Sequence, residues 1–289
     1  MPNRLPIPAW TLTLTAMFSV QLGTAMSLPM INEVGPAGTA WLRLTAGAII
    51  FIIISRPRLR SIRKKDWPFI IALGVNTGLV TIGFLAAVQR IPLGTAVAIE
   101  FLGPLTVATF KSHTRKAMIW PVIAFAGVLM MTRPWLGEVN VLGIVFAAAA
   151  AFGWGTYIVL TARIGDAYDG LTGLALTIPI AAITSAAFGV AAVVPHFKLA
   201  LVGQAFFLAL LLPVLPFALE LISLRHMSES AFGTLMSVEP AFGTLLGLII
   251  LHQQASALQL IGVSLVVLAG VGSQRIDHVH VEAPEIEMV

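Results

Sequence analysis

The stretch GTAVAIEFLGP, residues 94–104, contains one charged residue, Glu100, in a segment that is otherwise almost wholly apolar. The stretch GTLMSVEPAFG, residues 233–243, repeats its pattern of Gly-Thr, three variable residues, Ile or Val, and a glutamate. The second glutamate, Glu239, follows the first by 139 residues. The repeated pattern predicts that the chain contains two related halves, each with one carboxylate inside an apolar segment.

The composition is that of a membrane protein. Hydrophobic residues make up 58% of the chain and charged residues 10%, and the mean hydropathy is +0.94, which is too apolar for a soluble domain. The net charge of +4 does not indicate a nucleic-acid partner, because the basic residues form short clusters between apolar runs without interleaved aromatic residues. The chain has no cysteine, which excludes disulfides, thiol catalysis and cysteine-ligated metals.

Apolar runs between charged clusters predict an all-α integral membrane protein with about ten transmembrane helices. The first run, residues 5–32, is uncharged and too long for the apolar region of a signal peptide, so we expect a span rather than a cleaved leader. The predicted spans are 8–31, 35–55, 67–89, 91–110, 117–132, 139–162, 171–194, 200–223, 229–251 and 257–274.

The distribution of Lys and Arg predicts the orientation of these spans. With the amino terminus inside, 13 of the 17 basic residues fall in inner segments and 3 in outer loops, while Arg43 lies within a span. The outer three are Arg90, Arg133 and Lys198. The positive-inside rule therefore predicts a multi-pass protein of the inner (cytoplasmic) membrane with both termini in the cytoplasm.

A second internal match supports the division into halves. The tripeptide AGV occurs at residues 126–128 and again at 269–271, close to the separation of the two glutamates. Two similar units of five spans each must lie in opposite orientations, which is the inverted-repeat plan of many carriers. We expect a first repeat over 1–135, a second, inverted repeat over 136–275, and a disordered cytoplasmic tail over 276–289.

The segments GTAVAIEFLGPL, FGTLMSVEPAFGTLLGLI and LQLIGVSLVVLAGV, in two halves of five spans, resemble the drug/metabolite transporter superfamily, EamA type. Within it, the chain is most similar to threonine/homoserine and aromatic amino-acid exporters. The resemblance implies outward transport of a small zwitterionic amino acid, such as threonine, homoserine, methionine or an aromatic. Such proteins often carry Leu-Gly-Glu after the ninth span, where this chain has Leu251, His252 and Gln253, so no role of that carboxylate is transferred.

The polar residues inside the spans are the candidates for a substrate site. A carboxylate in the membrane interior costs roughly 2.5–3.5 kcal/mol, so it normally faces the interior of the bundle. Each glutamate either serves transport or locks the two halves by bonding Thr95, Thr234 or backbone amides. The proposed substrate-binding residues are Gln21, Asn76, Thr77, Glu100, Trp154, Tyr157 and Glu239. Candidates for coupling or gating are Glu100, Glu239, Glu220 and Arg43. Arg43 could bind a substrate carboxylate, or it could instead snorkel or pair with a glutamate.

The leading interpretation is a secondary transporter that works by alternating access. A passive small-solute channel and an intramembrane enzyme are the alternatives, although the chain lacks a phosphate-binding G-x-x-x-x-G-K-(S/T) loop and an H-E-x-x-H motif. We expect no cofactor and no metal, since His278 and His280 of the tail are too few ligands. The expected partners are the amino-acid substrate, the lipid bilayer and, as a candidate coupling ion, the proton. The protein is expected to be a monomer.

Overall fold

The described part of the chain is built of helices. The computed structural model describes residues 8–58, 62–111, 118–133, 140–165, 170–227 and 229–281, and the elements in these ranges are all helical. The α-helices are α1 (Ala9–Met26), α2 (Leu28–Ser55), α3 (Trp67–Val88), α4 (Leu93–Lys111), α5 (Ile119–Thr132), α6 (Val141–Gly165), α7 (Gly170–Val193), α8 (Leu199–Ala209), α9 (Leu215–Leu224), α10 (Glu229–Met236), α11 (Glu239–Ile249) and α12 (Ala257–Val281).

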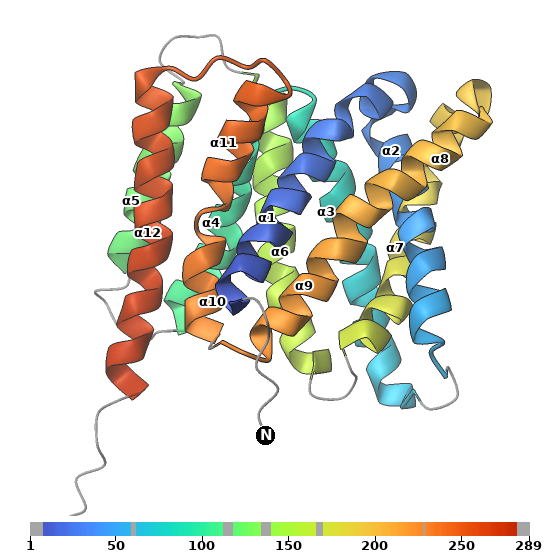
Figure 1. Ribbon diagram of the computed structural model, residues 1–289, viewed down its shortest axis with the longest axis horizontal. Helices are drawn as coiled ribbons and strands as arrows, with labels where there is room; N and C mark the ends of the chain where they lie inside the picture. Colours follow the sequence, from blue (N-terminus) through green and yellow to red (C-terminus); the bar gives the residue numbers. More distant parts are fainter. Residues whose placement is uncertain are drawn as a thin grey trace, which may run out of the picture.

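The number of membrane helices agrees with the sequence. Seven helical segments of the described chain are long and apolar enough to cross a membrane, and two of these, Leu199–Leu224 and Ala231–Ile249, each combine two helices. The shorter apolar helices Ile119–Thr132 and Ala257–Ser273, together with the 18-residue α1, bring the total to ten. The prediction of an all-α membrane protein with about ten membrane helices is confirmed. In Figure 1 the helices stand side by side, with α5 and α12 at one edge.

Two boundaries differ from the predicted spans. Residues 28–31, predicted to lie at the end of the first span, instead form the start of α2 together with residues 32–34, and α2 bends at Gly35 (φ 73°, ψ 168°) before Pro36. Glycine adopts this positive φ without steric cost, and the following proline has no N–H to continue the helix. At the other end of the chain, α12 continues to Val281, into the segment expected to be a disordered tail; residues 282–289 lie outside the described residues.

Two of the spans are interrupted near their middle, in both cases at a proline. Between α8 and α9, Leu212 has an extended backbone (φ −161°, ψ 112°), as expected of a residue that precedes a proline, here Pro213. Between α10 and α11, Pro240 cannot donate to the carbonyl of Met236, and a new helix begins at Glu239. Pro104 likewise cannot donate to the carbonyl of Glu100, which predicts a matching break in the fourth span, but α4 continues through it.

The helix neighbours form a nearly symmetric set. The sixth span, α6, packs against α3 and α4, and the first span, α1, packs correspondingly against α9 and the α10–α11 pair. The pairs α2 with α7, α4 with α11, and α5 with α12 each join one span to its counterpart in the other half. If each of the first five spans is replaced by its counterpart among the last five, and the reverse, most pairs of neighbouring helices recur.

Small residues let two of these pairs approach closely. A Cβ atom on Gly127 of α5 would lie 2.6 Å from the carbonyl oxygen of Gly262 in α12. A Cβ atom on Gly94 of α4 would lie 2.9 Å from the Cα atom of Thr244 in α11. Close backbone approach at small residues is the usual way in which membrane helices pack.

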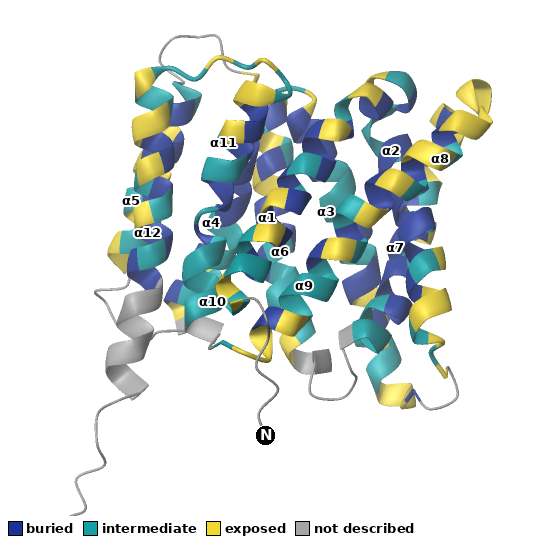
Figure 2. Ribbon diagram, viewed as in Figure 1, coloured by how far each residue is buried: buried dark blue, intermediate teal, exposed yellow. Residues whose placement is uncertain are grey.

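The two ends of the bundle differ in packing. At the end where α4 begins and α11 ends, here called the Gln253 end, residues 84–88 of α3 and 93–101 of α4 are all buried. Toward the opposite end, where α1 begins, residues 231–236 of α10 are all only half-buried. Figure 2 shows the same contrast between the buried part of α11 and the half-buried α10. These parts of α3 and α4 are therefore packed more tightly near the Gln253 end than α10 is toward the opposite end.

Candidate functional site

A buried pair of polar side chains joins the first span to the ninth. Glu239 is the first residue of α11 and is 4% exposed, and Gln21 of α1 is 1% exposed. The Nε2 atom of Gln21 donates a hydrogen bond to Oε1 of Glu239 at 2.9 Å. Both residues are among the substrate-binding candidates of the sequence analysis, and the structure brings them together.

Each member of this pair has one oxygen left over. Oε1 of Gln21 and Oε2 of Glu239 are buried and have no hydrogen-bond partner among the described residues. Buried polar atoms are almost always hydrogen-bonded, and both of these oxygens are acceptors when the carboxylate is ionised. The start of α11 also favours a negative charge through its helix dipole. The pair can therefore accept hydrogen bonds from a cationic group with several N–H donors, such as an ammonium.

Two further carboxyl groups face the same region. Glu100 of α4 is 8% exposed and Glu220 of α9 is half-buried, and both lie within electrostatic range of Glu239. No hydrogen bond joins the side chain of Glu100 or Glu220 to another residue in the described ranges. Gain or loss of a proton at one of these carboxyls therefore changes the protonation equilibrium of its neighbours. The sequence predicts Glu100 and Glu220 as candidates but does not predict that they converge.

Trp154 lies on the inward face of α6. It continues the stripe of Ala147 (0% exposed) and Ala150 (1% exposed), whereas Phe152 on the opposite face is 80% exposed. Trp154 itself is half-buried. Tyr157, also half-buried, packs beside the cluster around Ile70 and lies within electrostatic range of Glu220.

Asn76 and Thr77 in α3 are partly engaged in structure. Nδ2 of Asn76 donates to the carbonyl of Gly153 at 2.9 Å, which ties α3 to α6 next to Trp154. The hydroxyl of Thr77 donates to the carbonyl of Leu73 in its own helix at 2.8 Å. Asn76 is therefore a residue that fixes α6, and Thr77 follows the usual pattern of a threonine in a membrane helix.

Arg43 is 4% exposed, so it does not snorkel outward. Its Nη1 donates to Oγ of Ser27 at 3.3 Å, and its Nε has no partner among the described residues. The salt bridges of the described residues are Arg63 with Asp66 and Lys198 with Glu33, so Arg43 forms none with a described carboxylate. Ser27 follows Gln21 by six residues, about 9 Å along a helix, which separates Arg43 from the Gln21–Glu239 pair.

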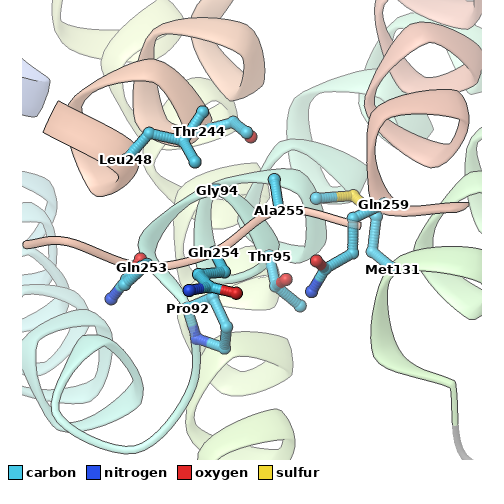
Figure 3. A pocket seen from close by; sticks show the side chains of 10 residues that line it. All are labelled: Pro92, Gly94, Thr95, Met131, Thr244, Leu248, Gln253, Gln254, Ala255 and Gln259. Carbon is cyan, nitrogen blue, oxygen red and sulfur yellow. The ribbon is translucent and has the colours of Figure 1, made fainter. Parts of the chain in front are cut away.

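Gln253 forms a contact that the sequence analysis did not predict. Its Oε1 accepts a hydrogen bond from the backbone N–H of Leu93, at the first turn of α4, at 3.0 Å. Its own N–H donates to the carbonyl of Gly247 near the end of α11. Figure 3 shows Gln253 among the residues that line a small cavity, together with Pro92, Thr95 and Thr244. The first N–H groups of a helix have no acceptor within the helix, so this helix start needs one from elsewhere. The side-chain oxygen of Gln253 provides it, as a glutamate oxygen would.

The described residues offer no metal site. No group of three or more His, Asp or Glu side chains within the described ranges could hold a metal ion. The side chains of His278 and His280 lie outside the described residues.

Comparison with known proteins gives a consistent result. The model of the EamA-like transporter family matches residues 141–272. The threonine/homoserine exporter RhtA of Escherichia coli K12 is 34% identical over 279 residues, which cover 94% of this chain and 92% of that protein. RhtA of Salmonella typhimurium LT2 is 33% identical over 92% of both chains. The uncharacterized transporter YvbV of Bacillus subtilis is 26% identical over half of each chain.

A solved crystal structure of a protein has a similar fold. It superposes with a TM-score of 0.57 over 95% of this chain and 99% of that one, at 16% sequence identity. At this identity the likeness concerns the arrangement of the helices alone.

Proposed function

Because this chain belongs to the EamA-like transporter family, we propose that it exports small amino acids of the threonine and homoserine type across the cytoplasmic membrane. It is a multi-pass membrane transporter rather than an enzyme. The relatives named as threonine/homoserine exporters are matched over more than nine-tenths of their length. The observation in the structure that carries the proposal is the buried Gln21–Glu239 pair with its two unpartnered oxygens.

This pair suits the ammonium group of an amino acid. Oε2 of Glu239 offers a negative charge and Oε1 of Gln21 a second acceptor, in a site shielded from water. A charge-assisted hydrogen bond is stronger than a neutral one, and burial increases its strength further. Trp154 and Tyr157 would form the wall against the substrate side chain, with Asn76 holding α6 in place. Because aromatic residues can also contact larger apolar side chains, methionine and the aromatic amino acids are further candidate substrates.

Alternating access between two inverted repeats, 1–135 and 136–275, is the proposed mechanism. The nearly symmetric set of helix neighbours supports this division. Residues 93–101 of α4 are buried near the Gln253 end, whereas α10 is only half-buried at the opposite, looser end, as expected of a carrier whose central site is accessible from one side. With both termini in the cytoplasm, the looser end faces the compartment from which an exporter takes up its substrate.

Protons are the proposed coupling ions. Glu100, Glu220 and Glu239 interact electrostatically, and carboxyl groups in the membrane interior are the usual proton carriers of transporters. The proposed unit of transport is the monomer, since one chain contains both halves.

Counterflow in proteoliposomes tests the export proposal. Vesicles loaded with unlabelled L-threonine and placed in labelled L-threonine should accumulate label transiently, because a carrier exchanges its substrate. Homoserine should replace threonine, and an imposed pH gradient should drive net transport that an uncoupler abolishes. A passive channel would let the label equilibrate without an overshoot. Absence of an overshoot with every amino acid tested would contradict the proposal.

The orientation has its own test in a chain that lacks cysteine. Lys65 and Gln254 are both exposed and lie at opposite ends of the bundle. An impermeant maleimide added to intact cells should label a Gln254→Cys variant and should label a Lys65→Cys variant only after the cells are opened. The reverse pattern would contradict the proposed orientation.

A further inference from the structure

A cavity of about 280 Å³ opens at the Gln253 end, apart from the central carboxyl groups. Its volume is several times the roughly 30 Å³ that one water molecule occupies, so a small organic solute fits. The polar residues that line it are Arg90, Thr95, Thr132, Arg133, Asn140 and Gln259. Figure 3 shows Thr95, Met131 and Gln259, which also line the smaller adjoining cavity. None of the described lining residues is an Asp or Glu.

The two amide side chains of this cavity use their oxygens elsewhere. Oδ1 of Asn140 accepts from the N–H of Gly143 at 2.9 Å, at the start of α6. Oε1 of Gln259 accepts from the N–H of Ser256 at 2.8 Å, at the start of α12. Each amide oxygen is therefore engaged at a helix start, and each NH₂ group remains available as a donor to a ligand.

The two arginines add charged donors. Arg90 is held in place, because Nη1 donates to the carbonyl of Ala86 at 2.7 Å and its guanidinium carbon lies 5.2 Å from the ring centre of Phe146. Arg133 follows α5 in the left-handed conformation (φ 46°), and its Nε is buried without a partner among the described residues. Two guanidinium groups and two NH₂ groups make a lining that is rich in donors, and this combination suits a carboxylate.

We propose that this cavity binds the carboxylate of the exported amino acid after the substrate has left the central site. Thr95 links the two places, because it lines the cavity and precedes Glu100 in α4 by five residues, about 7.5 Å along the helix. The inference rests on the proposed export function: the central site holds the ammonium, and the cavity at the Gln253 end receives the carboxylate.

A probe without an ammonium group isolates the second site. N-acetyl-L-threonine keeps the carboxylate and loses the positive charge that the Gln21–Glu239 pair would recognise. Its equilibrium binding to the full chain in nanodiscs should weaken by about tenfold or more in Arg133→Gln and in Arg90→Gln. L-Threonine methyl ester, which lacks the carboxylate, should not compete, and neither should sodium chloride at the same concentration.

Arg56→Gln is the matched control. Arg56 follows α2 in the same left-handed conformation (φ 45°) in which Arg133 follows α5. The N–H of Arg56 donates to the carbonyl of Ile52, just as the N–H of Arg133 donates to the carbonyl of Leu129. Unlike Arg133, Arg56 lies outside the cavity and is exposed. The control should bind the probe like the wild type. Both arginine variants should keep the thermal stability of the control.

Three results would overturn the inference. They are equal binding in the wild type and both arginine variants, equal displacement by the methyl ester, and displacement by chloride, which would indicate a general anion site. Counterflow by the wild type tests the export proposal independently. If the wild type transports and the arginine variants bind the probe as well as the wild type does, only the second site is ruled out.

Discussion

The two copies of the glutamate motif fold differently, although their sequences match. In the first half the motif lies within one continuous helix, α4, which passes through Pro104. In the second half the chain turns at residues 237–238 and begins α11 at Glu239. The proline follows Glu100 by four residues but follows Glu239 directly. A proline in the first turn of a helix loses no hydrogen bond, so Pro240 favours a new helix start there.

This difference gives the two carboxyl groups different surroundings. Glu239, at the start of α11, meets the amide of Gln21 in the other half of the chain and keeps one free oxygen. Glu100 lies within a helix and has no hydrogen-bond partner among the described residues, but it responds to the charge of Glu239. We therefore expect Glu239 to bind the substrate and Glu100 to affect mainly the protonation of the site.

The largest expected effect is that of Glu239→Gln. The substitution keeps the shape of the side chain but removes the charge that would hold the ammonium. The KM of L-threonine in counterflow should rise at least about 30-fold, which corresponds to about 2 kcal/mol. The control is Glu33→Gln, which removes a more exposed ion pair with Lys198 and should change the KM little. A KM equal to that of the control would assign Glu239 to packing.

Glu100→Gln should separate the two glutamates. The KM of L-threonine should stay within about threefold of the wild type, because Glu100 is not expected to contact the ammonium. Removal of a titrating neighbour should, however, flatten the dependence of transport on pH. Counterflow measured over a series of pH values checks this. An unchanged pH profile together with a large rise in KM would reverse the roles of the two glutamates.

Gln21→Leu should weaken transport less than Glu239→Gln does. The substitution removes the amide that orients the carboxylate, and a buried partner left without its hydrogen bond costs about 1–3 kcal/mol, so the KM should rise about tenfold. The control is Thr24→Ala in the same helix, whose hydroxyl bonds the carbonyl of Val20 in its own helix. If both variants have the same KM, the hydrogen bond to Glu239 has no part in binding.

Trp154→Phe should have the smallest effect. A smaller ring on the inward face of α6 should change the ratio of KM values for phenylalanine and threonine by about threefold, with thermal stability nearly unchanged. The control is Phe152→Leu on the outward face of the same helix, which should leave the ratio unchanged. A lower melting temperature with an unchanged ratio would make Trp154 a packing residue.

The membrane helices are predictable from the sequence because each is a long apolar run with charged or turn-forming ends. The interruption at Glu239 is predictable too, since Pro240 removes the hydrogen bond to Met236. Pro104 shows the limit of this reasoning. There α4 stays continuous despite one missing bond, in a helix that packs closely against the backbone of Ala151 at Gly103.

The site is only partly predictable, because its contacts join distant parts of the chain. Gln21 and Glu239 can each be recognised as polar residues in apolar helices, but 218 residues separate them and no local pattern links them. The lining of the cavity at the Gln253 end is less predictable still. Whether Asn140 and Gln259 offer donors or acceptors depends on which of their atoms cap a helix.

Binding of L-threoninol tests the central claim most directly, which is that Glu239 and Gln21 hold the ammonium of the substrate. This molecule keeps the ammonium and the hydroxyl of threonine and has an alcohol in place of the carboxylate. Labelled L-threoninol should bind the wild type and Arg133→Gln equally in nanodiscs, and should bind Glu239→Gln at least about 30-fold more weakly. Equal binding to the wild type and Glu239→Gln would contradict the account.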